Sequence, residues 1–322
     1  MLSPIAISCT ILAGQALAHS HIAYIIVNGR MFRGYDAKSG DVPARLANPP
    51  AQVVAWSARN PDDGFVSPDN YTSPDMICHR DGLPAVAHAP VSPGDAIHIQ
   101  WNGWPQSHVG PALSYLARCG GGGGCADVDK GDLRFFKIDN SSPVLLGPTT
   151  ADGRGGPAPP GRWVSDVLIE RNNSWQVRVP RGLAPGPYVL RHELIALHYA
   201  AKSDGAQNYP QCINLWVKAG NDSSSGGGAK SWGPGAVGYG QGVSPTAMYG
   251  RGDAGILIDV NRPLSTYRIP GPTLVSGAEP IPATAQASSM PTAWGTPVRV
   301  VSGSTTVALP VPETFVPRPA PS

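Results

Sequence analysis

Tyr188-Val-Leu-Arg-His-Glu-Leu-Ile-Ala196 is the stretch of this 322-residue chain that decides its fold. It is rich in apolar and β-favouring residues, and Cys212–Val217 (CINLWV) repeats that character a short distance further on. Short runs of this kind, bounded by Gly, Pro, Asn and Asp, are typical of strands that are buried on both faces. We therefore predict two buried strands here.

Other segments around this pair also favour strands. Ile22–Val27 ends at Asn28-Gly29, a strong signal for a hairpin turn. Ala96–Trp101 and the segment 175–179 alternate apolar with polar residues, as half-buried strands do. A helical period is weak nearly everywhere. Many short strands with long loops predict an all-β fold, an immunoglobulin- or fibronectin-like sandwich of two sheets, with a barrel as the alternative.

The composition excludes several partners. The formal net charge is +2, charged residues make up 14% of the chain, and no polybasic run occurs. Nucleic acid and anionic membranes are therefore not expected as partners. Apart from the N-terminal run described next, no apolar stretch approaches the length of a membrane span. A soluble monomer is expected.

The N-terminus has the pattern of a secretory signal. Leu2–Gly14 is largely apolar, and Ala16-Leu17-Ala18 supplies the small-x-small pattern of a cleavage site. Residues 1–18 are therefore predicted to be removed, which makes His19 the first residue of a secreted protein. Its free α-amine and its ring could then close one chelate on a metal ion. If cleavage falls elsewhere, His19 is an ordinary surface residue.

The cysteines fit an oxidising compartment. Of five, Cys9 would leave with the signal and four would remain, an even count that indicates two disulfides in a secreted protein. Cys119 and Cys125 flank a glycine run and are predicted to pair, leaving Cys78 to Cys212. A zinc site is the rival interpretation, but the spacings do not resemble paired Cys-x-x-Cys knuckles.

The chain changes character after Val275. Residues 276–322 are rich in Pro, Ala, Ser and Thr and contain almost no charge and no cysteine. Such a composition predicts a disordered tail without a disulfide-bonded carbohydrate-binding module. Val298–Val301 and Thr305–Leu309 nevertheless have local strand propensity.

Three segments hold side chains suited to metal chemistry. Residues 104–111 (WPQSHVGP) form a turn-rich loop with His108, and His192–His198 is a predicted strand that ends in a histidine. Residues 205–212 (GAQNYPQC) place Gln207 and Tyr209 just before a cysteine predicted to form a disulfide. Taken singly, His198 could be a core histidine, Gln207 a loop amide and Tyr209 an anchored aromatic side chain.

Taken together, these strings resemble those of fungal lytic polysaccharide monooxygenases of auxiliary activity family nine, formerly glycoside hydrolase family sixty-one. The matching strings appear in the family's order across roughly residues 19–275: HSH (19–21), VNG (27–29), SHVGP (107–111), RHELIALH (191–198), GAQNYPQC (205–212), DAGI (253–256) and IPGP (269–272). Asn208 and Ala254 depart from common family residues and affect loop shape more than metal binding.

The resemblance implies a copper site. His19 would give its amine and a ring nitrogen, His108 a third nitrogen, and Tyr209 would lie at the axial position. His198 and Gln207 would hydrogen-bond to oxygen or peroxide and to the Tyr209 hydroxyl. Three nitrogens with an open position suit copper, whereas zinc prefers a tetrahedron and has no redox cycle.

The resemblance also implies the substrate and the reaction. The enzyme would use O2 or H2O2 and an external reductant to cleave a β-1,4-glucan, such as cellulose, at C1 or C4. Long loops would form a flat substrate face on which Tyr249 stacks against sugar rings, with Tyr35 and Tyr24 as weaker candidates. A non-catalytic secreted copper protein and a metal-free glycan-binding sandwich are the alternatives. No carboxylate pair or nucleophile motif stands out for ordinary hydrolysis.

The remaining polar candidates receive simpler interpretations. His21 could join the terminal amine in a different copper-binding mode, but it lies in a predicted strand and is expected to be structural. His79, His88 and His98 are expected to be solvated or part of the core. Four Asn-x-Ser/Thr sequons are candidate glycosylation sites: Asn70, Asn140, Asn172 and Asn221.

Overall fold

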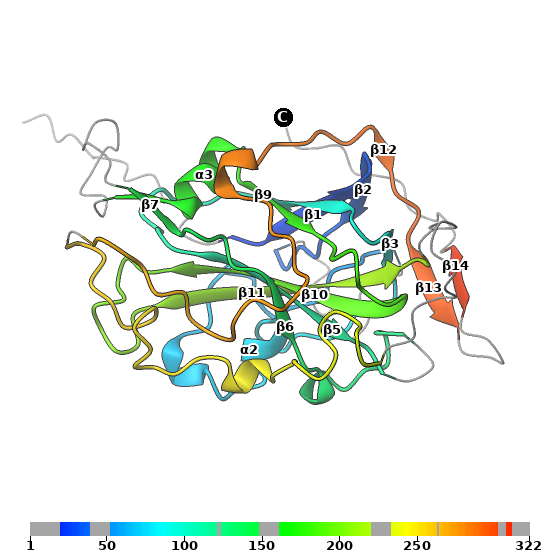
Figure 1. Cartoon of the computed structure of the whole chain (residues 1–322), viewed down its shortest axis with the longest axis horizontal. Helices are drawn as coiled ribbons and strands as arrows, with labels where there is room; N and C mark the ends of the chain where they lie inside the picture. The colour runs from blue at the N-terminus through cyan, green and yellow to red at the C-terminus, as the bar shows by residue number, and fades with distance from the viewer. Residues whose placement is uncertain are drawn as a thin grey trace, which may run out of the picture.

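The protein folds into two stacked β-sheets connected by long loops (Figure 1). The structure is a computed structural model that describes residues 20–38, 52–120, 124–147, 161–219, 233–262, 264–301 and 307–310. Each large sheet has five strands. Because the two sheets are separate and keep open edges, the prediction of a sandwich is confirmed over the alternative of a barrel.

The first sheet contains the N-terminal strand at its centre. Its order is β12 (Ala293–Trp294), β2 (Arg30–Arg33), β1 (Ile22–Val27), β4 (Ala96–Trp101) and β9 (Ser174–Arg178). The turn between β1 and β2 is formed by Asn28 and Gly29, whose φ angles are 49° and 76°. Both residues are left-handed, as an Asn-Gly hairpin turn requires, so the predicted hairpin is confirmed.

The second sheet contains the two predicted buried strands as its longest members. Its order is β3 (Ala89–Val91), β11 (Gln207–Val217), β10 (Gly186–Ala196), β5 (Ala112–Arg118) and β6 (Phe136–Asp139). Every residue of β10 is buried. The core between the sheets includes three fully buried tryptophans: Trp101, Trp163 and Trp175.

Four chain segments meet at one end of the sandwich. The start of β1 lies opposite the end of β4, where Ile22 pairs with Trp101. In the other sheet, the end of β10 lies opposite the start of β11, where Ala196 pairs with Gln207. The loops that carry His108 and His198 leave these strands at this same end. Topology therefore brings distant parts of the sequence together there.

Helices and small sheets complete the described chain. The helices are α2 (Asp75–Cys78) and α3 (Val164–Glu170), and four 3₁₀ turns lie at Pro68–Asn70, Lys130–Asp132, Pro245–Ala247 and Ala283–Ala285. Two small pairs are β7 (Leu145–Gly147) with β8 (Arg162–Trp163) and β13 (Val298–Val301) with β14 (Val307–Pro310). Among the described residues, no helix is long and apolar enough to cross a membrane.

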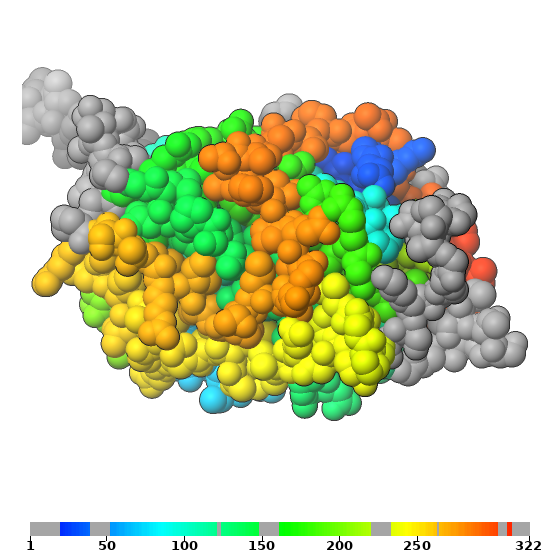
Figure 2. Space-filling model, viewed as in Figure 1, coloured from blue at the N-terminus to red at the C-terminus, as the bar shows by residue number. Residues whose placement is uncertain are grey.

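The segment after Val275 corrects one prediction. Disorder was expected, but residues 276–301 pack on the sandwich, from Gln286 beside β9 to Val298 beside His88, and Figure 2 shows this part of the chain in orange on the surface. The side-chain amide of Gln286, 3% exposed, bonds the backbone of Gln176 on edge strand β9 in both directions, at 2.7 and 3.1 Å. Strand β12 extends β2 at the opposite edge. Pairing at both edges offsets the entropy of ordering this segment.

The same segment also contains the predicted local strands. β13 spans Val298–Val301, as the sequence suggested, and β14 covers Val307–Pro310. His88 forms a backbone bridge to Val298, which fastens the hairpin to the sandwich. Residues 302–306 and 311–322 lie outside the described residues.

Candidate metal centre

The first described residues are tied to the loop that carries His108. Ser20 is fully buried, and its hydroxyl donates to Oδ1 of Asn102 at 2.6 Å. The same oxygen accepts from the backbone N–H of His21 at 2.9 Å, and the Asn102 N–H donates to the His21 carbonyl at 3.0 Å. His19 lies outside the described residues. The described chain therefore begins at a residue that is fixed to the loop carrying His108.

His21 has a structural role, as predicted. Its Nδ1 lies 2.8 Å from Oδ1 of the fully buried Asp63, whose other oxygen pairs with Nζ of Lys38 at 2.8 Å. Burial alone would raise the pKa of Asp63, but hydrogen bonds and charges from His21 and Lys38 outweigh it and lower that pKa. With its ring held by Asp63, His21 acts as an anchor of the N-terminal segment. Sequence reasoning did not identify Asp63.

His108 lies in a tightly held turn between β4 and β5. Its backbone N–H donates to Pro105 at 3.0 Å, and its carbonyl accepts from the indole N–H of Trp104 at 2.8 Å. A Cβ on Gly110 would lie 1.9 Å from the carbonyl oxygen of Ile195, so only glycine fits at that position. The loop is thereby pressed against β10 with the His108 ring 4% exposed.

The His198 ring packs face to face with the His108 ring. Their centroids are 4.0 Å apart with an interplanar angle of 28°. His198 lies two residues beyond the end of β10, and the intervening Leu197 donates a backbone hydrogen bond to Val109 at 2.9 Å. The structure therefore brings together the two histidines that the sequence singled out.

Tyr209 and Gln207 form the other part of the site. The Tyr209 ring is fully buried, its hydroxyl donates to Oε1 of Gln207 at 2.9 Å, and it packs edge-on against Trp104 at 5.0 Å. Trp104 also packs edge-on against His108, at 5.6 Å. Burial raises the pKa of the Tyr209 phenol above its ordinary value, so the hydroxyl stays protonated at neutral pH.

One further residue links β1 to the strand that carries Tyr209. Gln211 accepts a hydrogen bond from the Ile22 N–H at 2.8 Å, and its amide nitrogen lies 3.5 Å from the Ser20 carbonyl. Gln211 belongs to a motif quoted above, but its role depends on a contact between residues 189 positions apart. Asn102, Asp63 and Gln211 together hold the N-terminal segment against its neighbours.

Both predicted disulfides are present. We call Cys78–Cys212 the long disulfide and Cys119–Cys125 the short disulfide, with sequence separations of 134 and 6. Because all four cysteines are bonded in pairs, the zinc interpretation is wrong. The long disulfide fastens helix α2 to β11, three residues beyond Tyr209.

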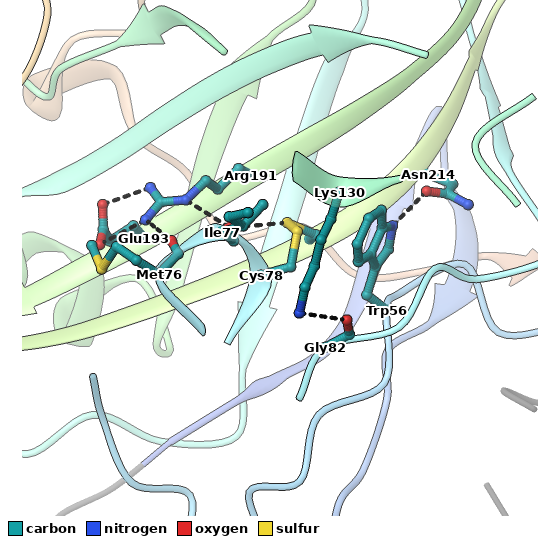
Figure 3. The surroundings of a disulfide bond; sticks show 10 residues. Trp56, Met76, Ile77, Cys78, Gly82, Lys130, Arg191, Glu193 and Asn214 are labelled. Atoms are coloured by element: carbon teal, nitrogen blue, oxygen red, sulfur yellow. Dashed lines mark hydrogen bonds and ion pairs between the residues drawn. A yellow bond between two sulfur atoms is a disulfide. The ribbon is translucent and has the colours of Figure 1, made fainter. Parts of the chain in front are cut away.

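A buried ion pair lies near the long disulfide (Figure 3). The guanidinium of Arg191 donates to both oxygens of Glu193, at 2.7 and 3.1 Å, and to the backbone carbonyls of Met76 and Ile77. Both charged side chains are fully buried. Arg191 therefore joins α2 to β10 just as the disulfide joins α2 to β11.

Tyr249 corrects the prediction of a surface tyrosine. It is 7% exposed, its hydroxyl donates to Glu193 at 2.6 Å, and it shares a 2.6 Å hydrogen bond with Tyr115. Tyr35 is also buried, at 6% exposed, whereas Tyr24 is partly buried. The buried carboxylate of Glu193, which also accepts from Arg191 and Asn208, receives this hydroxyl bond, and the contact holds the Tyr249 ring inward. It cannot stack on a polymer outside.

The three other candidate histidines are buried, whereas the described glycosylation sequons are exposed or partly exposed. His79, His88 and His98 are buried, which matches the core interpretation. Asn70 and Asn172 are exposed and Asn140 is partly exposed, while Asn221 lies outside the described residues. Accessibility is compatible with glycosylation at the three described sequons.

The described side chains alone do not supply enough ligands for a metal ion, and a further ligand must come from a residue outside the described chain. Within residues that the structure describes, no three His, Cys, Asp or Glu side chains form a metal-binding cluster. His108 supplies one imidazole, and the buried, protonated phenol of Tyr209 is at most a weak further ligand. A terminal amine and imidazole at His19, adjacent to the anchored Ser20, would complete a nitrogen-rich set of the kind that copper prefers.

Comparison with known proteins identifies the class of enzyme. The sequence profile of Auxiliary Activity family 9 (formerly GH61) matches residues 19–267. The chain is 44% identical over 280 residues to the AA9 family lytic polysaccharide monooxygenase D of Podospora anserina, covering 86% of this chain and 72% of that protein. These similarities define a lytic polysaccharide monooxygenase.

Solved structures agree with this result. The extended catalytic domain of H. jecorina LPMO9A has a TM-score of 0.70 and 45% identity, covering 86% of this chain and 98% of that domain. A more distant structure, a cellulose-active polysaccharide monooxygenase from M. thermophila, has a TM-score of 0.59 and 29% identity, covering 80% of this chain and all of that one. The chain belongs to auxiliary activity family 9, whose members are copper-dependent oxidoreductases that cleave polysaccharides.

Proposed function

We propose that this protein is a secreted copper monooxygenase that cleaves β-1,4-glucan, with cellulose as its main substrate, at C1, C4 or both. It would use O2 or H2O2 and an external electron donor. The observation that carries the proposal is the junction of the Ser20–His21 segment with the His108 loop, next to His198. The cellulose-active relative from M. thermophila supports the choice of substrate.

We assign copper to His19, His108 and Tyr209. The amine and ring of His19 and the ring of His108 would provide nitrogen donors, and the Tyr209 phenol would be a weak further ligand. When bound, copper supplies the one-electron redox chemistry with oxygen or peroxide that removes a hydrogen beside the glycosidic bond. Hydroxylation at that carbon breaks the chain by elimination.

The protein's own groups position and protect the site. Oε1 of Gln207 accepts a 2.9 Å hydrogen bond from the Tyr209 hydroxyl, which fixes the orientation of the phenol. Trp104 packs against Tyr209 and His108, so water has little access to their inner faces. His198, stacked on His108, would donate to or accept from the oxygen species and orient it.

Secretion and removal of residues 1–18 are part of the proposal. The family profile begins its match at residue 19, the residue that cleavage after Ala18 would expose. Two disulfides agree with an oxidising compartment. Mass spectrometry of the mature N-terminus tests this step, because any start other than His19 removes the proposed amine ligand.

A non-catalytic copper-binding protein is the second candidate, and a metal-free glycan binder is the third. The buried Gln207–Tyr209 pair favours the enzyme, because a copper carrier has no need of an ordered hydrogen-bonding group beside its ion. The experiment incubates copper-loaded mature protein with cellulose, ascorbate and H2O2 and analyses the products. Oxidised oligosaccharides support the enzyme, copper binding without them supports the carrier, and no copper binding leaves the glycan binder.

A matched variant sharpens the test. Adding one alanine before His19 keeps every side chain, but the terminal amine then belongs to the added alanine and no longer to His19. Copper binding and oxidised products should both be lost with the fold unchanged by circular dichroism. Products oxidised at C1 and at C4 can be separated chromatographically, which determines the regioselectivity.

A further inference from the structure

The residue after His198 presents an aromatic ring to solvent. Tyr199 is 59% exposed, and its ring centroid lies 4.4 Å from that of His198. His198 in turn stacks on His108 at 4.0 Å. Three rings therefore follow one another from the exposed surface to the buried imidazole proposed to bind copper.

The loop that carries Tyr199 is rigidly held. The Tyr199 carbonyl accepts from the Lys202 N–H at 3.1 Å, and a Cβ on Gly205 would lie 1.9 Å from that same oxygen. The next residue, Ala200, is fully buried and accepts from the Ile258 N–H at 2.8 Å. Because the backbone on both sides of Tyr199 is fixed, little backbone entropy is lost when the residue binds a partner.

We propose that Tyr199 is a stacking platform for one glucopyranose ring of the substrate. The inference rests on the proposed function and replaces the surface role expected of Tyr249. A pyranose ring presents C–H groups on its faces, and these pack on the negative face of an aromatic ring. The polar neighbours Lys202 and Asp204 are exposed and can bond sugar hydroxyls at the edge of the ring.

Other exposed aromatic side chains of the described chain lie elsewhere. Trp294, 42% exposed, belongs to β12 and pairs with Met31 near the far end of β1. Tyr239, 43% exposed, follows Gly238, whose Cβ position would lie 2.4 Å from Phe136 on the outer strand β6. Tyr199 is the exposed ring that directly follows His198 and packs against it, so position selects Tyr199 for contact with a sugar near the reacting bond.

The test measures binding of copper-free protein to microcrystalline cellulose. Tyr199→Ala should weaken binding by roughly 3- to 10-fold, the range for loss of one aromatic contact. Tyr199→Phe should bind like the wild type, and the matched control Tyr239→Ala should change binding by less than about 1.5-fold. Copper affinity, measured by calorimetry, should be equal in all four proteins.

The outcomes separate this inference from the proposed function. The proposed role of Tyr199 is refuted if Tyr199→Ala binds cellulose as tightly as the wild type, or if Tyr239→Ala loses as much cellulose affinity as Tyr199→Ala. It is also refuted if the wild type does not bind cellulose. Weaker copper binding in Tyr199→Ala overturns it too, because the residue would then act through the metal centre. If the wild type binds cellulose but neither binds copper nor forms oxidised products, the proposed function alone is refuted.

Discussion

Asn102 offers a direct test of how the N-terminal segment is prepared for copper. Its Oδ1 accepts from the Ser20 hydroxyl at 2.6 Å and from the His21 N–H at 2.9 Å, and the residue begins the loop that carries His108. Asn102→Ala removes these two hydrogen bonds, together with the longer contacts of its Nδ2 to Nδ1 of His21 at 3.2 Å and Oδ2 of Asp63 at 3.4 Å, and leaves every proposed ligand in place. The N-terminal segment should then lose part of its order in the copper-free protein.

The size of the effect follows from these two contacts. A hydrogen bond of this kind contributes about 1 kcal/mol net, so the two together hold the segment by about 2 kcal/mol. In the variant, copper binding must supply this ordering free energy. At 1.4 kcal/mol for each factor of ten, copper affinity should fall by about 30-fold.

Competition calorimetry against a chelator of known affinity measures this change. Asn261→Ala is the matched control, because Asn261 is exposed and its side chain bonds only the nearby Asp259 in the described chain. Its copper affinity should equal that of the wild type. The copper(II) electron paramagnetic resonance spectrum of Asn102→Ala should match the wild-type spectrum, because the ligands are unchanged.

Two results would refute the reasoning. If Asn102→Ala binds copper within about twofold of the wild type, the anchor does not prepare the site. If the resonance spectrum changes, the substitution has altered ligation, and the loss of affinity has another cause. Thermal unfolding of the copper-free variant checks that the whole domain remains folded under the assay conditions.

Three further predictions concern the copper-free protein in urea. Replacing both cysteines of the long disulfide by serine should destabilise the fold by about 5 kcal/mol, and the same change in the short disulfide by about 2 kcal/mol. The reason is that a longer closed loop restricts the unfolded chain more. Equal losses of stability would contradict this. Glu193→Gln leaves the buried Arg191 without its counter-charge and should cost about 3–5 kcal/mol, whereas Glu170→Gln at an exposed pair should cost less than about 1 kcal/mol. Burial lowers the pKa of His79 and of His88 to about 4, so the unfolded chain binds more protons between that pH and about 6.5. Stability should therefore fall by about 2 kcal/mol per histidine from pH 7 to pH 5, and a His88→Gln variant with the same slope as the wild type would disprove its contribution.

The sequence determined the strands and most of the candidate site. Apolar runs and alternation identified Ile22–Val27, Ala96–Trp101 and the long strand through Tyr188–Ala196, because burial of side chains follows a local period. The cysteine count and spacing gave both disulfides. The resemblance to the family selected His108 and His198, which the structure stacks on each other.

Tertiary structure decided which side chains face outward and what holds the terminus. Tyr249 turns inward, where its hydroxyl donates to Glu193, a residue 56 positions away. Tyr199 faces outward because its loop is fixed by distant backbone contacts. Asn102 acts across 82 residues, and Gln286 orders the C-terminal segment by pairing with an open strand edge. Such contacts depend on the relative placement of whole strands, which no local pattern of residues encodes.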